Sequence, residues 1–137
     1  MASGADTFRI LLVEDQPAIR ELVATMLRSG STDVDAAATG AEGLTRVRET
    51  AYDLILLDIV LPVLDGLSLC RLIKADPTLQ KTPLYMLTAN SKRSDVEAAT
   101  AAGANGYIHK PFRTSELVEL VERLRSEKRA ALQSPPR

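Results

Sequence analysis

The fold is decided by YDLILLD, residues 52–58, in which four consecutive apolar residues, Leu54 to Leu57, lead to the carboxylate of Asp58. Parallel strands that helices cover on both faces are typically continuous apolar runs of this length. Trp is absent and aromatic residues make up 4% of the chain, so the core must be built from Leu, Val, Ile and Ala. We therefore predict a central parallel strand at residues 52–57, with Asp58 directly after it.

Strands and helices alternate along the rest of the chain. Further strands are predicted at residues 9–13, 83–88 and 106–109, with a weaker one at 33–38. Apolar residues at helical spacing predict helices at residues 17–27, 41–48, 67–74 and 94–102, and a last helix that opens at Thr114. Five strand–helix units in this order predict an α/β fold, a doubly wound five-stranded parallel sheet of order 2-1-3-4-5 that is flavodoxin-like.

Length and composition indicate one small domain. For the 137 residues we expect a domain over 8–125, a flexible segment over 1–7 and a polar tail over 126–137. A net charge of −1 gives no general attraction to nucleic acid or to anionic membrane. One cysteine, with no leader and no long apolar run, is typical of a cytoplasmic protein. The helix dipole accounts for positive charge near the expected end of the last helix, at Arg123, Arg125, Lys128 and Arg129.

Charged and polar residues stand at the ends of the predicted central strands. Glu14 and Asp15 follow the first strand and Asp58 the third, while Thr88 and Lys110 mark the ends of the fourth and fifth. Open α/β sheets bind ligands at this carboxyl edge, where the strand order reverses. Two carboxylates about 4 Å apart repel by roughly 4 kcal/mol at an effective dielectric constant near 20, and one lysine does not balance three. Because Mg²⁺ prefers oxygen ligands, the set predicts a magnesium site, in which Mn²⁺ can substitute.

Asp58 is the candidate nucleophile, because it follows the most apolar strand. A carboxylate can attack phosphorus to give an aspartyl phosphate. The metal and Lys110 would neutralise the transferring oxygens, and Thr88 would donate its hydroxyl to another of them. Neither Gly-x-Gly-x-x-Gly nor a loop ending in Gly-Lys-Ser/Thr follows the first strand, so nucleotide binding is not supported.

Together these segments resemble the receiver domains of bacterial two-component response regulators, over about residues 8–125. The matching pieces are ILLVED (10–15), LILLDIVLP (54–62), DG (65–66), LTA (87–89) and GANGYIHKPF (103–112). Each piece is weak alone, but five in this order form a specific signature.

The resemblance implies a role for each matching residue. Asp58 is implied to be the phosphoacceptor, and Lys110 the lysine that contacts the phosphoryl group. Asp15 is implied to bind Mg²⁺ directly and Glu14 through water, and the other ligands are Asp58 and the backbone carbonyl of Val60. The remaining matches have switch or structural roles: Thr88 and Tyr107 as the switch pair, Pro62 and Gly66 in the loop after the acceptor, and Pro111 in a cis peptide bond with Lys110.

The implied function is a phosphorylation-activated switch of a phosphorelay, which is not an enzyme beyond its own phosphorylation and dephosphorylation. A histidine kinase, a histidine phosphotransfer protein or a small phosphodonor would supply the phosphoryl group. An unknown downstream protein would bind the face of the last two strand–helix units, residues 91–102 and 107–124. No direct nucleic-acid or membrane partner is expected. A monomer or weak dimer is expected, because Asn105-Gly106 replaces the acidic pair common in regulators that dimerise through that face.

Other functions fit parts of the pattern less well. A phosphatase with an aspartyl nucleophile would have a second Asp two residues later, where Val60 stands. A flavin-binding domain of this topology needs a Ser/Thr-rich loop after the first strand, and EDQP (14–17) is not one. The complete acidic set disfavours a degenerate receiver that acts only as a scaffold. Val60 lies two residues after Asp58, and Asn90 lies two residues after Thr88. Both positions should influence the lifetime of the phosphoryl group, and we predict that the group is lost slowly.

Overall fold

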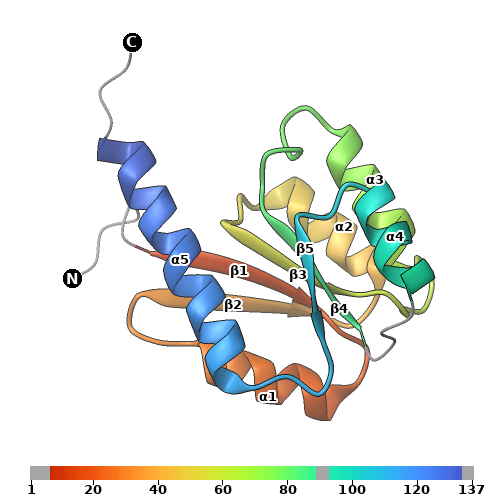
Figure 1. Cartoon of the computed structure of the whole chain (residues 1–137), viewed down its shortest axis with the longest axis horizontal. Coiled ribbons are helices and arrows are strands. Elements are labelled where there is room, and N and C mark those ends of the chain that lie inside the picture. Colours follow the sequence, from red (N-terminus) through yellow and green to blue (C-terminus); the bar gives the residue numbers. More distant parts are fainter. Residues whose placement is uncertain (1–6, 89–92, 134–137) are drawn as a thin grey trace.

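In the computed structural model, which describes residues 7–88 and 93–133, strands and helices alternate along the chain (Figure 1). The strands are β1 (Phe8–Val13), β2 (Thr32–Ala37), β3 (Leu54–Asp58), β4 (Leu84–Thr88) and β5 (Gly106–His109). The helices are α1 (Pro17–Leu27), α2 (Gly40–Glu49), α3 (Gly66–Ala75), α4 (Arg93–Ala101) and α5 (Thr114–Gln133). The described strands form one parallel sheet of order β2-β1-β3-β4-β5, which confirms the predicted fold and strand order.

Helices cover both faces of the sheet (Figure 1). α1 and α5 pack on one face, where their apolar residues meet Ile10, Leu12, Leu54 and Leu56. α2, α3 and α4 pack on the other, against Leu11, Val13, Ile55 and Leu57. Every residue of β3 is buried, because its side chains alternate between two covered faces. Asp58 is the last residue of this strand, and not the first residue after it, because it pairs with Leu87 of β4.

The last helix is longer than the sequence predicted. The expectation of a polar tail from residue 126 is wrong for residues 126–133, which continue α5. Glu, Lys, Arg, Ala, Leu and Gln make up most of this segment and are strong helix formers, which pattern analysis of apolar residues alone does not register. The rest of the predicted tail, and residues 1–6 of the predicted flexible segment, lie outside the described residues.

Two basic side chains hold α5 to the amino edge of the sheet. Arg125 is buried, lies over the ring of Phe8 at 5.3 Å and donates to the carbonyl of Ser31 at 3.1 Å. Lys128 donates to Asp53 Oδ2 at 3.1 Å and to the carbonyl of Thr7 at 3.0 Å. These contacts with the sheet, rather than the helix dipole, account for the two charges.

Gly66 brings the first turn of α3 against the backbone of Asp58. A Cβ atom at Gly66 would lie 2.0 Å from the carbonyl oxygen of Asp58, and the Gly66 N–H donates to the Ile59 carbonyl at 2.9 Å. The preceding residue, Asp65, caps the helix by accepting the Ser68 N–H at 2.9 Å. Only glycine allows the helix to begin this close to the end of β3.

We predict that Gly66→Ala lowers the free energy of unfolding by about 1–3 kcal/mol, because the added methyl group must push the loop away from Asp58. Gly30→Ala is the matched control, since a Cβ at Gly30 would meet nothing within 4 Å. Urea denaturation of the two variants and the native chain measures the difference. Equal stability of the two variants would contradict this account of Gly66.

Candidate functional site

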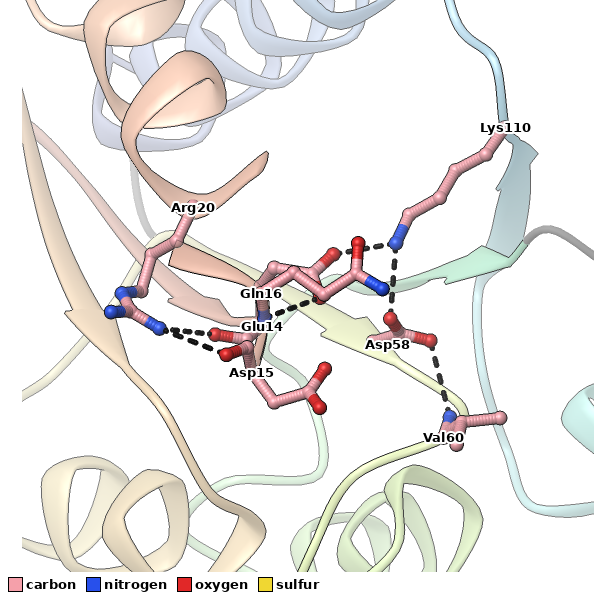
Figure 2. A network of polar contacts seen from close by, with 7 residues as sticks. All are labelled: Glu14, Asp15, Gln16, Arg20, Asp58, Val60 and Lys110. Atoms are coloured by element: carbon pink, nitrogen blue, oxygen red, sulfur yellow. Dashed lines mark hydrogen bonds and ion pairs between the residues drawn. The ribbon is translucent and has the colours of Figure 1, made fainter. Parts of the chain in front are cut away.

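Charged side chains gather at the carboxyl edge of the sheet (Figure 2). Glu14 and Asp15 follow β1, Asp58 ends β3, and Lys110 follows β5. β1 and β3 are neighbours in the centre of the sheet, and the helices that follow them, α1 and α3, pack on opposite faces. The connections that leave β1 and β3 therefore run to opposite faces of the sheet, and open α/β sheets bind their ligands at such a point.

Three carboxylates lie together at this edge. Oxygen atoms of Glu14, Asp15 and Asp58 lie within 4.8 Å of one another. Glu14 is 0% exposed and Asp58 is 9% exposed, whereas Asp15 lies at the surface. Burial raises the pKa of Glu14, and the hydrogen bond from Lys110 offsets this only in part. The three carboxylates thus carry an excess of negative charge in a partly buried environment.

Lys110 bridges two of the three carboxylates. Its Nζ donates to Glu14 Oε1 at 2.5 Å and to Asp58 Oδ2 at 3.0 Å. Burial alone would lower the pKa of Lys110, but its hydrogen bonds with the two carboxylates outweigh burial, and the pKa lies above its usual value. The peptide bond from Lys110 to Pro111 is cis. One ammonium group faces three carboxylates, so the site retains a deficit of positive charge.

Backbone N–H groups orient the two buried carboxylates. The Val60 N–H donates to Asp58 Oδ1 at 3.1 Å, and the Gln16 N–H donates to Glu14 Oε2 at 3.3 Å. Asp58 therefore has one oxygen on the Val60 N–H and the other on Lys110 (Figure 2). This arrangement fixes its carboxylate at the rim of the crevice.

The loop after Asp58 turns sharply at Pro62. The Leu64 N–H donates to the Pro62 carbonyl at 2.8 Å, so the turn closes around Val63, whose φ is 71°. A positive φ costs a residue with a side chain roughly 1–2 kcal/mol. Val63 is β-branched and lacks the conformational freedom of glycine, so the turn holds it in an unfavourable backbone conformation.

The acidic group fits a small divalent cation with oxygen ligands. Carboxylate oxygens of this spacing can converge on one ion, and Mg²⁺ typically takes one or two carboxylates and keeps several waters. Asp15 supplies an exposed carboxylate that faces solvent, as an ion with bound waters requires. Among the described residues this is the one group of acidic, histidine or cysteine side chains close enough to hold a metal.

The other residues predicted from the sequence lie outside the acidic group or outside the described part of the chain. Thr88 ends β4, but its side chain lies outside the described residues, as does Asn90. Tyr107 lies in β5 and is 39% exposed. The side chain of Val60 is 69% exposed and brings no polar group to the crevice. Cys70 lies in α3, where it is buried among apolar side chains.

One residue beside the site was not identified from the sequence. Arg20 of α1 donates from Nη1 to the carbonyl of Glu14 at 2.9 Å (Figure 2). Arg20 lies about one helical turn after the first residue of α1, but this position is a weak indication of a functional role, because exposed arginines are common on helices.

Solved structures of high similarity share this fold. The receiver domain of the sensor histidine kinase PA1611 from Pseudomonas aeruginosa, with a magnesium ion coordinated in its active-site cleft, has a TM-score of 0.81 and 38% identity, and covers 88% of this chain and 98% of its own. The chemotaxis response regulator CheY4 of Vibrio cholerae has a TM-score of 0.80 and 28% identity, over 86% of this chain and 98% of its own.

Relatives by sequence are longer proteins. The DNA-binding response regulator MtrA of Mycolicibacterium smegmatis is 41% identical over 113 residues, which cover 82% of this chain and 48% of MtrA. The phosphate regulon transcriptional regulatory protein PhoB of Rhizobium meliloti is 36% identical over 114 residues, which cover 83% of this chain and 50% of PhoB. The chain thus spans about half the length of these relatives.

MtrA is a DNA-binding regulator, so the expectation that nucleic acid is not a partner is not supported. None of the described helices is both long and apolar enough to cross a bilayer.

The family assignment follows from a match over most of the chain. The response regulator receiver domain matches residues 10–122, a range that includes the three carboxylates and Lys110. Receiver domains are signalling switches rather than conventional enzymes, and they bind Mg²⁺ at an acidic pocket. With the sheet order, the acidic crevice and the relatives in agreement, this chain belongs to the response regulator receiver domain family of two-component systems.

Proposed function

We propose that the chain accepts a phosphoryl group on Asp58 in a reaction that depends on Mg²⁺, and that the modification changes which partner it binds. The proposal rests on the excess of negative charge around Asp58, where Lys110 is the one described side chain that forms ion pairs with the carboxylates. A cation held by the carboxylates, with a phosphoryl group next to Lys110, would balance the charge of such a site.

Each residue has a chemical task in this proposal. A carboxylate oxygen of Asp58 attacks phosphorus, a P–O bond forms, and the bond from phosphorus to the donor nitrogen or oxygen breaks. Lys110 then shifts its ammonium group toward the phosphoryl oxygens, for which its raised pKa keeps it protonated. Mg²⁺, held by Asp15, Asp58, the Val60 carbonyl and, through water, Glu14, would neutralise charge on the same oxygens.

The donor would reach Asp58 from the side of α1. A hollow beside Asp58 is lined mainly by apolar residues of α1 and of the loops after β3 and β5: Ile19, Leu22, Met26, Val60, Pro111 and Phe112. An apolar surface next to the nucleophile suits a protein donor, and we propose a histidine kinase or a histidine phosphotransfer protein, with small phosphodonors as substitutes. This role would place the chain in the cytoplasm.

The output would pass through the face that contains β5. Thr88 would turn its hydroxyl toward the phosphoryl group, and the exposed ring of Tyr107 would turn inward, which would alter the surface offered to a downstream protein. Asn105 and Gly106 contact residues of β4 at this face. Asn105 Oδ1 accepts the Leu84 N–H at 2.9 Å, and a Cβ at Gly106 would lie 2.7 Å from the ring of Tyr85. Because neither offers a carboxylate to a second copy, we propose a monomer or weak dimer.

Incubation with acetyl phosphate and Mg²⁺ tests the acceptor directly. We expect intact-mass spectrometry to show the gain of one phosphoryl group by the native chain and none by Asp58→Asn, which keeps the shape of the side chain but lacks the nucleophilic charge. Chelation of Mg²⁺ should abolish labelling of the native chain. Labelling that persists in Asp58→Asn would disprove the site.

The affinity for Mg²⁺ should depend on pH through Glu14. The metal needs the ionised carboxylate, and burial raises the pKa of Glu14, so protons compete with Mg²⁺ at a higher pH than at an ordinary glutamate. Affinity should fall as the pH is lowered through this raised pKa, and below that pKa each ion bound should release up to one proton from Glu14. Calorimetric titration in two buffers of different ionisation enthalpy counts these protons. Glu14→Gln should bind more weakly with a flatter pH dependence, and a native affinity that stays constant until ordinary carboxylates titrate would refute the role of Glu14.

Val60 should make the phosphorylated state long-lived. Its exposed apolar side chain cannot orient a water molecule for attack on phosphorus, so we expect a half-life of minutes or longer for the purified phosphoprotein in Mg²⁺. Val60→Asn should shorten this half-life by about tenfold or more. Val60→Ala is the matched control, because it changes the same exposed position without adding a polar group. Loss within seconds from the native chain would contradict the prediction.

A further inference from the structure

Arg20 joins α1 to the backbone that carries the acidic pair. Its Nη1 donates to the carbonyl of Glu14 at 2.9 Å and lies 3.5 Å from the carbonyl of Asp15 (Figure 2). The side chain thus contacts the main chain of two of the three acidic residues and is half-buried against it. We infer that Arg20 is a positioning residue for the divalent-cation site, which holds these two peptide groups so that the Glu14 and Asp15 carboxylates face the ion; the inference rests on the proposed Mg²⁺ site.

The two carboxylates differ in how much they need this support. Glu14 is buried, and its own oxygens are held by the Gln16 N–H and by Lys110. The exposed Asp15 carboxylate has no hydrogen bond or ion pair within residues 7–88 and 93–133, and no dashed line reaches it in Figure 2. Its direction is therefore set by its backbone, which Arg20 holds from one side.

The surrounding loop offers few other restraints. The Glu14 N–H is bound to the Ala37 carbonyl at 3.0 Å, which continues the pairing of β1 with β2. Two residues later, Gln16 caps α1 without a side-chain hydrogen bond. The short segment between these points carries neighbouring carboxylates that repel one another, and the Arg20 guanidinium is the side-chain donor that the structure shows on its carbonyls.

Positioning and simple charge predict opposite effects on metal binding. If Arg20 acted only as a positive charge near the site, its removal would strengthen the binding of a divalent cation, because one repulsive charge would be lost. If it positions the ligands, its removal must weaken binding, because the Asp15 and Glu14 backbones gain freedom. Residues that orient metal ligands from outside the coordination shell typically change metal affinity by 10–100-fold.

Mn²⁺ binding, measured from the electron paramagnetic resonance signal of the free ion, tests the inference without any phosphodonor. We expect Arg20→Ala to bind Mn²⁺ about tenfold more weakly than the native chain, and Arg20→Lys, which keeps the charge and one donor group, to fall between them. The matched control is Arg28→Ala. Arg28 lies at the other end of α1 and also donates to a backbone carbonyl, that of Val34, at 3.0 Å.

Arg28→Ala should lose thermal stability comparable to that of Arg20→Ala but keep native Mn²⁺ affinity, so that a general loss of stability is separated from positioning. With acetyl phosphate as donor, Arg20→Ala should need about tenfold more Mg²⁺ for half-maximal labelling, while its rate at saturating Mg²⁺ stays close to native.

Equal or tighter Mn²⁺ binding by Arg20→Ala would overturn the inference and leave the proposed function intact. If the native chain itself bound no Mn²⁺, the proposed metal site and the inference would both fail. Labelling of Asp58 in the native chain tests the proposed function without any change at Arg20, so the two failures remain distinguishable.

Discussion

Three carboxylates lie close enough to repel one another at one edge of the sheet, and the other features of the site reduce or use this repulsion. Glu14, Asp15 and Asp58 bring oxygen atoms within 4.8 Å of one another, and Lys110 reaches only two of the three residues. Burial raises the pKa of Glu14, the neighbouring Asp58 carboxylate adds to this rise, and Lys110 offsets it only in part. A cluster of this kind is unfavourable as a purely structural element, because an apolar substitute would be more stable. Its presence is explained by the ion and the phosphoryl group that it can bind.

The fold supplies the geometry that makes such a cluster possible. Neighbouring parallel strands end at the same edge, so that residues 14 and 58 are brought together although they are far apart in the chain. β3 lies in the centre and is wholly buried, which gives Asp58 apolar walls and a fixed backbone. Gly66 lets α3 begin against that backbone, and the Val60 N–H fixes one oxygen of the carboxylate. At the opposite edge, Arg125 and Lys128 attach α5 to the ends of strands, away from the chemistry.

Local pattern was sufficient to predict the fold and the members of the acidic group. The apolar run before Asp58 identifies the central strand, and the residues after each strand identify the candidate ligands, because strand ends are decided by nearby sequence. The features that escaped prediction depend on contacts between distant segments. Residues 126–133 have no apolar periodicity, and the contacts of Arg125 with Ser31 and of Lys128 with Asp53 join parts of the chain that no local pattern connects. The bonds from Arg20 to two carbonyls were equally invisible, since they involve backbone atoms that any residue offers. The switch roles of Thr88 and Tyr107 stay predictions.

A divalent cation in the acidic crevice would be visible in a crystal structure of the chain grown with Mn²⁺, with anomalous scattering recorded near the manganese absorption edge. We expect an anomalous peak between the carboxylates of Asp15 and Asp58, with Lys110 released from at least one of its two carboxylate partners. A map without a peak, in which Lys110 still bridges Glu14 and Asp58 while Asp15 points into solvent, would disprove the metal site.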